Sequence, residues 1–370
     1  MKKNSTGQRG TKARSQKQER LTIGVDLGDK TSQCCALNGE GEVLFERRIA
    51  TSKKGMAQMF GALGKCRVAL EVGSHSPWVS RLLAGFGHEV IVANARQVQL
   101  IVQSTRKDDK LDARTLARLA RIDPELLRPI RHRSEQAQLD LTRIRVRAAL
   151  VEARTALVNT ARGLAKALGE RLPKCSAAYL TVDEIGTLPE AVRSVLEPVL
   201  QQIESLSEQI HTCDKELEQI ARTQYPETEL LQQVSGVGTL IALTFVLTVE
   251  DPARFRKSRQ AGCYLGLRPK RRDSGESRPQ LGISKEGDSY LRKLLVQGAH
   301  CIVKRSGPDT DLKRWGLQLA ARGGKNAKKR AVTAVARKLA VLLHRLWVTG
   351  AVYQPLRNSQ AQAQAKGKAA

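Results

Sequence analysis

Residues 21–28 read LTIGVDLG, an apolar run that carries the carboxylate of Asp26 near its end. A short apolar run bounded by glycine and polar residues is typical of a buried β-strand. Two more strands are predicted over 33–37 and 43–49, and the turn sequence Asn38-Gly39-Glu40-Gly41 between them favours a hairpin. The folded part of the chain is therefore expected to begin with three consecutive strands.

Helices and strands alternate in the next stretch of the chain. The expected elements are a helix near 55–63, a strand over 67–71, a helix from Pro77 to Leu83 and a strand over 89–93. Three strands, helix, strand, helix, strand is the element order of the ribonuclease H-like fold. The sequence therefore predicts an α/β domain of this type over residues 21–130.

Residues 131–224 follow a helical period instead. A first apolar stripe comprises Val146, Leu150, Ala153, Leu157, Leu164 and Leu168. After a break at Pro173 and Gly186, a second stripe comprises Val199, Ile203, Leu206, Ile210, Cys213, Leu217 and Ile220. Its spacings alternate between four and three residues, which is the pattern of a coiled-coil seam. An antiparallel pair of helices within one chain and a coiled coil between two chains both fit this pattern.

Three further segments complete the predicted layout. Residues 225–352 read as a mostly helical and strongly basic C-terminal domain. Residues 1–20 read as a disordered basic arm, and residues 353–370 as a disordered tail. The expected fold class is thus α/β plus α, with coiled-coil helices between the two domains.

The charge of the chain indicates its class of partner. The sequence holds 63 Lys and Arg against 36 Asp and Glu, for a formal net charge of +27. A charge of this size repels itself unless a polyanion supplies countercharge, so nucleic acid is the expected partner. Aromatic residues make up only 4% of the chain, which argues against a stacking platform for single strands as the main device.

Two other classes of protein are excluded by inspection. The longest apolar stretch, residues 240–249, is about half of the ~20 residues that a membrane-spanning helix needs. The seven cysteines are scattered and form no C-x-x-C pair, so neither a zinc ribbon nor a disulfide framework is indicated. Reduced thiols in a cytosolic protein are the expectation.

Four carboxylates are candidates for a metal site. Asp26 and Glu71 each end a predicted strand, and Asp109 and Asp112 lie on one face at the start of a predicted helix. Together they would form a cluster of hard oxygen ligands, which suits Mg²⁺ and phosphoryl transfer. Each residue alone also fits a turn cap or a helix N-cap. Asp108 adjoins Asp109 and could take its place.

The C-terminal region carries the candidate contacts to nucleic acid. A Gly turn at Gly236 and Gly238 resembles the turn of a helix-hairpin-helix motif, whose backbone N–H groups approach a phosphate, or it simply links two helices. The cations expected to contact phosphates are Arg268, Lys270, Arg271, Arg272, Lys285, Lys328, Lys329 and Arg330, with Lys325, Arg337 and Lys338 along the same final helix. Ser274 follows the first four, but spacing alone favours an exposed loop serine. His75 lies close after Glu71 and is expected to be mainly structural.

Six motifs in a fixed order carry a family resemblance. They read GVDLG, ALEVGSHSPW, RKDDKLDARTLARLAR, GVGTLIAL, CYLGLRP and DSGESRPQLGISKEGDSYLRKLLVQGAH. The chain resembles the DEDD transposases of bacterial insertion sequences, the insertion-sequence one-ten family, which also includes Piv-type DNA invertases. The likeness covers nearly all of residues 21–350.

The resemblance implies a fold, a site and a set of partners. It implies a RuvC-like domain joined by a coiled coil to a transposase domain. The metal ligands would be Asp26, Glu71, Asp109 and Asp112, holding Mg²⁺ with Mn²⁺ as an alternative. Ser274 would attack a DNA phosphate. The partners would be donor and target double-stranded DNA, a noncoding guide (bridge) RNA, and further copies of the chain in a dimer or tetramer, in the bacterial cytoplasm at the nucleoid.

The residues also depart from the family pattern and leave alternatives open. Many relatives have an uncharged residue in place of Asp108, and Asp273 precedes the serine where relatives often have Ser or Gln. A site-specific DNA invertase and a RuvC-like Holliday-junction resolvase that uses water are the alternative enzymes. A nucleic-acid-binding protein without chemistry is the third hypothesis.

Overall fold

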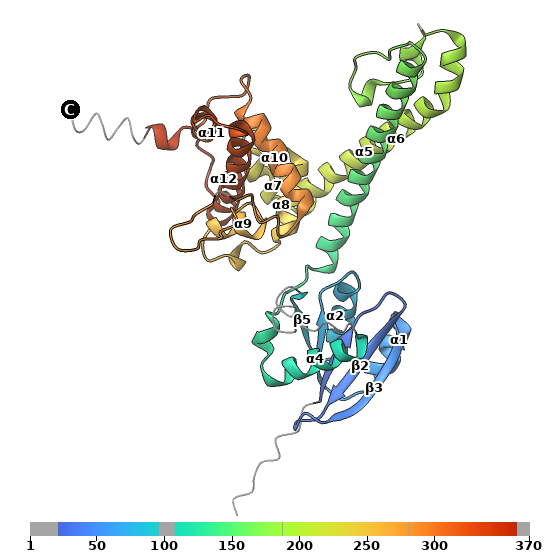
Figure 1. Ribbon diagram of the computed structural model, residues 1–370, viewed down its shortest axis with the longest axis vertical. Helices are drawn as coiled ribbons and strands as arrows, with labels where there is room; N and C mark the ends of the chain where they lie inside the picture. Colours follow the sequence, from blue (N-terminus) through green and yellow to red (C-terminus); the bar gives the residue numbers. More distant parts are fainter. Residues whose placement is uncertain (1–20, 96–107, 187, 280, 361–370) are drawn as a thin grey trace, which may run out of the picture. The chain divides into compact units, whose positions relative to one another are not determined.

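The computed structural model describes residues 21–95, 108–186, 188–279 and 281–360 (Figure 1). The chain divides into two compact units, the first ending at Arg133 and the second beginning at Ser134. The helices expected over 131–224 belong to the same unit as the C-terminal region. The predicted arm, 1–20, lies outside the described residues.

The first unit is built on a five-stranded mixed sheet with the order β3-β2-β1-β4-β5. Its strands are β1 (Thr22–Asp26), β2 (Thr31–Leu37), β3 (Val43–Ala50), β4 (Arg67–Glu71) and β5 (Glu89–Ala93). The first three strands pair antiparallel, whereas β1, β4 and β5 run parallel. The predicted order of strands and helices is confirmed, because α1 (Lys53–Phe60) and α2 (Ser76–Gly85) fall where the sequence places them.

Both faces of this sheet are covered, and the alternation of side chains along β4 shows how. Val68 and Leu70 pack in one apolar cluster with residues of α1 and α2. Ala69, between them, packs on the other side with Leu116 of α4 (Asp109–Ile122). Successive residues of a strand point to opposite faces, so a continuous apolar run is what a strand covered on both sides requires.

Gly24 sets how closely α4 lies on β1. A Cβ atom at this position would meet the carbonyl oxygen of Ala113 at 2.0 Å and the backbone nitrogen of Ala117 at 2.5 Å. The backbone of α4 therefore lies very close to β1, and the residues of α4 at this contact are alanines. Arg114 secures the same helix, since its Nη2 lies 2.7 Å from Oε1 of Glu46 on β3. This close contact brings the first turn of α4 to the edge where β1 ends.

The second unit begins with two long helices, α5 (Glu135–Ala167) and α6 (Glu190–Gln224). Arg147 pairs with Asp214, and Arg154 donates to Ser207 (3.0 Å), so later residues of α5 meet earlier residues of α6. The helices therefore form an antiparallel pair within one chain, which is one of the two arrangements that the heptad pattern allowed.

The apolar face predicted for α6 is largely correct, but the one predicted for α5 is wrong. Ile203, Leu206, Ile210 and Leu217 are buried as expected. On α5, however, Val146, Leu164 and Leu168 are exposed, and the contact with α6 uses residues such as Val158 and Ala161. The sequence of α5 carries apolar residues on two faces, and its small residues allow the closer approach.

The rest of the second unit is a helical domain, in agreement with the predicted class. It contains α7 (Glu227–Gln232), α8 (Thr239–Val249), α9 (Arg259–Tyr264), α10 (Ser289–Val303), α11 (Asp311–Ala321) and α12 (Ala327–Thr349). Helix α8 is buried along its length from Ile241 to Val249, so it forms the centre of the core. Single-turn 3₁₀ helices occur at Pro124–Leu127, Ala177–Tyr179, Asp183–Ile185 and Pro252–Arg254. No helix within the described ranges is both long and apolar enough to cross a membrane.

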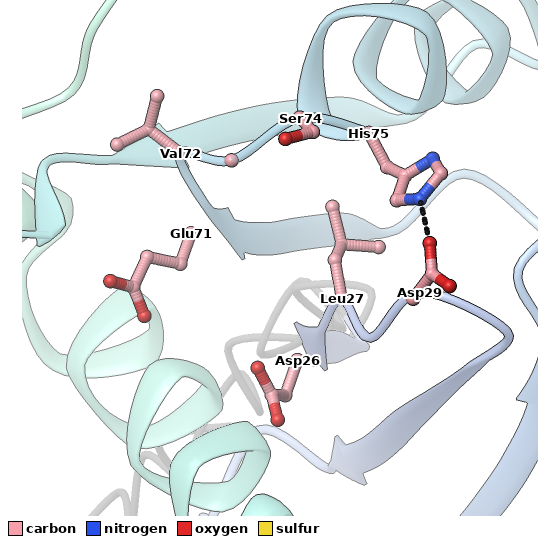
Figure 2. Close-up of a pocket in the computed structure, with 8 residues that line it drawn as sticks. Asp26, Leu27, Asp29, Glu71, Val72, Ser74 and His75 are labelled. Atoms are coloured by element: carbon pink, nitrogen blue, oxygen red, sulfur yellow. Dashed lines mark ion pairs between the residues drawn. The ribbon is translucent and has the colours of Figure 1, made fainter.

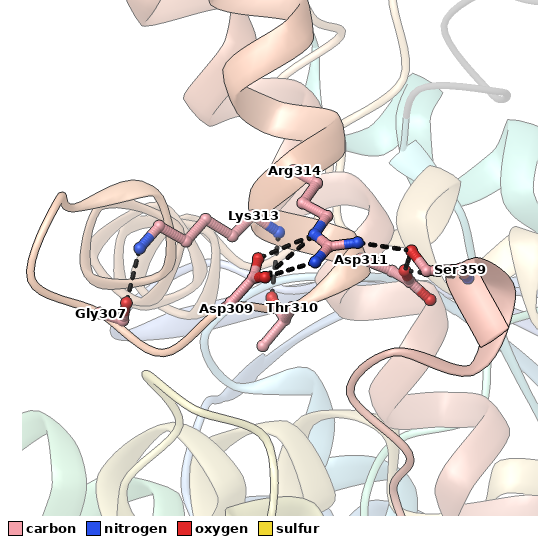
Figure 3. A network of polar contacts seen from close by, with 7 residues as sticks. All are labelled: Gly307, Asp309, Thr310, Asp311, Lys313, Arg314 and Ser359. Atoms are coloured by element: carbon pink, nitrogen blue, oxygen red, sulfur yellow. Dashed lines mark hydrogen bonds and ion pairs between the residues drawn. The ribbon is translucent and has the colours of Figure 1, made fainter.

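The chain stays ordered beyond the predicted start of the tail at residue 353. Tyr353 packs against the helical core, and the backbone N–H of Asp311 donates to the carbonyl of Pro355 (2.8 Å). The carboxylate of Asp311 accepts from the backbone N–H of Asn358. It also accepts from the backbone N–H and the hydroxyl of Ser359 (Figure 3). Residues 353–360 thus make specific contacts with the helical core that their polar composition does not indicate, and residues 361–370 of the predicted tail lie outside the described residues.

Candidate active site

Asp26 and Glu71 end neighbouring parallel strands at the same edge of the sheet. Val25 lies opposite Leu70 in the register of β1 and β4, so the next residue on each strand is one of the two carboxylates. Both line a cavity of about 260 Å³, together with Leu27, Asp29, Val72, Gly73, Ser74 and His75 (Figure 2). The structure thus brings together the two strand-end acids that the sequence predicts.

The first turn of α4 adds negative charge next to Glu71. Burial raises the pKa of the half-buried Glu71 carboxyl, and the nearby charge of Asp112 raises this pKa further. Asp108 has a different task, because it is the N-cap of α4 and its side chain accepts from the N–H of Lys110 (3.0 Å). The acids left in the first turn are Asp109 and Asp112, as the spacing predicts.

The donor set fits a divalent cation in chemistry, although it is not gathered into a closed site. Three carboxylates, those of Asp26, Glu71 and Asp112, lie in one region, and a divalent ion would relieve their mutual repulsion. Asp109 lies at the exposed start of α4. Over the part of the chain that the structure describes, no group of three or more His, Cys, Asp or Glu side chains is arranged to hold a metal ion.

Two residues of the cavity were missed or undervalued by sequence reasoning. Asp29 was not singled out, although it follows Asp26 in the same strand-end segment, and its Oδ1 lies 3.5 Å from Nε2 of His75. His75, expected to be mainly structural, lines the cavity. Its Nδ1 accepts a hydrogen bond from Nε1–H of Trp78 (3.1 Å), which fixes the orientation of the ring, and Figure 2 shows its contact with Asp29.

Ser274 lies at the tip of an arm in the second unit. The arm closes at its base through a bridge between Pro269 and Ile283, and its tip is a tight turn in which Ser274 and Ser277 exchange both backbone hydrogen bonds (3.2 and 3.0 Å). Gly275 has a φ of +55°, a conformation that glycine adopts readily. This turn explains why glycine follows the serine, and it leaves the serine exposed.

The cations predicted in and near the serine arm, the hairpin from Pro269 to Ile283, are also exposed. This holds for Arg268, Lys270, Arg271 and Arg272, of which Arg268 lies 3.7 Å from Glu286. Lys285 stands at the base of the arm with a φ of +59°. In α12, Lys328, Lys329 and Arg330 are exposed in the first turn. All these positions are accessible to a polyanion.

The two glycines of the predicted turn have different surroundings. Gly236 packs against α10, since a Cβ there would meet the carbonyl oxygen of Gly298 at 2.8 Å. This close approach supports the helix-linking role that the sequence left open. Gly238 is exposed and precedes the first residue of α8, and a Cβ at this position would have no neighbour within 4 Å.

Comparison with known proteins identifies relatives of this chain. A family model for DEDD transposases of the IS110 type, described as "Transposase", matches residues 23–168. A second model, "Transposase IS116/IS110/IS902 family", matches residues 228–313. The first match ends within the helical pair, and the second covers α7 to α10 with the serine arm. Together they span more than half of the chain.

Whole-length relatives agree with both models. The chain is 28% identical over 340 residues to "Transposase for insertion sequence element IS1111A" of Coxiella burnetii, a match covering 90% of this chain and 91% of the relative. It is 28% identical to "Probable family 20 transposase" of Pseudomonas aeruginosa, covering 90% and 98%. It is 29% identical to "Transposase for insertion sequence element IS1328" of Yersinia enterocolitica, covering 76% and 84%. The chain therefore belongs to the IS116/IS110/IS902 family of insertion-sequence transposases, enzymes that cut and rejoin DNA.

Proposed function

We propose that this transposase cuts and rejoins DNA strands through the hydroxyl of Ser274 and an acidic site that holds Mg²⁺. The observation that carries the proposal is the meeting of Asp26 and Glu71 in one cavity, with Asp112 close enough to raise the pKa of Glu71. This arrangement is what a RuvC-like domain of the ribonuclease H class would use. Asp109, in the same helical turn as Asp112, completes the proposed ligand set.

The acids have a role that follows from their charge. Asp26, Glu71, Asp109 and Asp112 would hold the ion, and the ion would supply positive charge next to the DNA phosphate. The carboxylates themselves repel a phosphate, so the chain needs cations elsewhere to admit its substrate. His75 and Asp29 line the same cavity. Their side chains would orient the DNA groups at its opening by forming hydrogen bonds to them.

Ser274 would act as the nucleophile on phosphorus. Its Oγ forms a bond to the phosphorus, the bond from phosphorus to one deoxyribose oxygen breaks, and the serine proton leaves to a base while the departing oxygen gains one. A DNA hydroxyl then attacks the phosphoserine, which restores the serine and joins the new strand. Arg271 and Arg272, beside the serine, would stabilise the negative charge that develops on the phosphate oxygens.

The test is recombination on a plasmid that carries the joined ends of the element, its noncoding RNA and a target. Wild type, Ser274→Ala, Asp26→Asn and Ser277→Ala are compared, and protein covalently attached to DNA is probed by denaturing electrophoresis. Ser277 is the matched control, because it pairs with Ser274 across the same turn. We expect adduct and recombination with wild type and Ser277→Ala, and neither with the other two. Cleavage by Ser274→Ala would instead identify a nuclease that uses water, such as a Holliday-junction resolvase.

Guidance by a noncoding RNA is part of the same proposal. In such a system base pairing reads the sequence, and the protein binds nucleic-acid backbones through its cations. The exposed cations of the second unit suit this role of binding nucleic-acid backbones. Omitting the RNA from the plasmid reaction should abolish recombination at the target, whereas recombination that continues without it would refute guidance.

We also propose that α5 joins two copies of the chain, within a dimer or tetramer. Its exposed residues Val146, Leu164 and Leu168 belong to the first apolar stripe of the sequence and are not buried against α6. A second copy offers the same stripe, so the two could pack along it. Leu164→Glu should lower the mass measured by sedimentation, whereas Lys166→Glu, two residues away, should not. An unchanged mass in Leu164→Glu would refute this interface.

A further inference from the structure

A basic groove in the second unit is larger than the acidic cavity of the first. It has a volume of about 1440 Å³ and lies between the base of the serine arm, α11 and α12. Eight of the described residues that line it are Lys or Arg, and none is Asp or Glu. Four of them, Lys329, Arg330, Arg337 and Lys338, follow one another along α12. A wall with one sign of charge concentrates a polyanion in the groove.

Apolar surface alternates with this charge. Leu267, Leu281 and Ile283 near the base of the serine arm line the groove, and so do Trp315 and Leu319 of α11. A double helix presents phosphates outward and keeps its bases stacked inside, so it offers phosphates to the cations but no base face to the apolar side chains. An unpaired strand exposes both phosphates and base faces, which matches a groove of cations and apolar side chains.

Trp315 is the aromatic residue of this groove, and a cation already covers it. Nζ of Lys338 lies 3.7 Å from the centroid of the indole ring. Burial lowers the pKa of Lys338, because part of its hydration is lost over the ring. The indole is half-buried and fixed in α11 next to the buried Gly316. A rigid aromatic face at the side of a basic groove is a stacking position.

We infer that this groove binds an unpaired nucleic-acid strand, with a base stacked on Trp315 in place of the Lys338 ammonium, which moves to the adjacent phosphate. The inference rests on the proposed function, since strand exchange creates unpaired segments. Lys329 and Arg337 hold the neighbouring phosphates. Because Leu267, Pro269 and Ile283 shape both the groove and the base of the arm, the strand in the groove runs to the foot of the hairpin that carries Ser274.

The test measures binding of labelled oligonucleotides by fluorescence anisotropy. The probes are a single DNA strand and a single RNA strand, each about 12 nucleotides long, and the corresponding DNA duplex. Wild type, Trp315→Leu, Lys329→Gln and the control Tyr179→Leu are compared, Tyr179 being exposed in the segment that connects α5 and α6. Trp315→Leu should weaken single-strand binding about tenfold and leave duplex binding and salt dependence unchanged. Lys329→Gln should lower the salt slope by about 0.7 for single strands.

The comparison of DNA with RNA identifies which strand the groove prefers, and either preference supports the inference. Equal loss of duplex and single-strand binding in Trp315→Leu, or no loss at all, would overturn it. If Trp315→Leu fails to fold, the fluorescence of Trp315 in a Trp78→Phe, Trp347→Phe variant still decides, because single strands should quench it and the duplex should not. The serine proposal is tested separately, since the covalent adduct on the plasmid depends on Ser274 whatever the groove binds.

Discussion

Tyr225 donates its phenolic hydrogen to the carboxylate of Asp140 across 2.8 Å, although the two residues are 85 positions apart. Asp140 is fully buried near the start of α5, where Gln136 (3.0 Å) and Arg143 also donate to it. Tyr225 follows the last residue of α6. Burial raises the pKa of its hydroxyl, and the hydrogen bond to Asp140 raises it further. This contact fixes the place where the helical pair returns to the core of the second unit.

Removing the Tyr225 hydroxyl should destabilise the second unit. Tyr225→Phe keeps the ring and leaves a buried carboxylate with one partner fewer, which costs about 1–3 kcal/mol of the free energy of unfolding. Urea denaturation followed by circular dichroism measures the change. Tyr179→Phe, at an exposed position, is the control and should change little. Equal stability of the two variants would show that the hydrogen bond adds nothing.

Adding one methyl group at Gly24 should disturb the acidic site without touching an acid. Gly24→Ala places a Cβ 2.0 Å from the backbone of α4, so the helix must move away from β1 and take Asp112 with it. Overpacking of this kind costs about 1–3 kcal/mol or more. We expect both lower stability and loss of DNA cleavage. Gly85→Ala, where nothing lies within 4 Å, is the control; similar effects in both variants would contradict the role of the close contact.

Mg²⁺ should raise the thermal unfolding temperature of wild type, because an ion that binds only the folded state stabilises it. Asp26→Asn and Glu71→Gln should lose this response. Asp108 and Asp109 provide a sharper comparison. Asp108→Asn keeps an N-cap and should keep the response, whereas Asp109→Asn should weaken it. The reverse result would assign the ligand to Asp108.

Stability of the first unit should fall in mild acid because of His132. Burial lowers the pKa of His132 below 6.5, and the charges of Arg81 and Arg133 lower it further. As the pH drops through 6.5, the unfolded chain takes up this proton before the folded chain does, so unfolding becomes more favourable. Above that pH both states are neutral at His132 and the effect disappears.

Two measurements check this pH dependence. An NMR titration of the imidazole should give a midpoint below 6.5. Unfolding at about pH 7.5 and about pH 5.5 should show a smaller loss in His132→Gln than in wild type, because glutamine cannot be protonated in this range. Nε2 of His132 lies 2.9 Å from Oγ of Ser76, which glutamine can still reach with its amide. An equal loss in both proteins would remove His132 as the cause.

The sheet and its acids could be predicted from the sequence because their signals are local. A strand covered on both faces reads as a continuous apolar run, and Asp26 and Glu71 mark where two such runs end. The buried face of α5 could not be predicted in the same way. Its sequence has Leu164 on one side and Ala161 on another, and packing against α6 decides which side is buried. The contact of His75 with Asp29 depends on how two separate loops meet, which spacing along the chain does not encode.

The antiparallel course of α5 and α6 has a consequence for how the family can vary. The distal half of the pair has its own apolar cluster, built from residues such as Val158, Leu172 and Leu200, which contains no residue of the helical core. The pair therefore leaves the helical core at the start of α5 and returns to it at the end of α6, whatever the length of the two helices. Equal insertions of whole heptads into the two helices would lengthen the protrusion and leave its base untouched. The distance that this pair reaches from the core can therefore change in evolution while the contacts at its base stay the same.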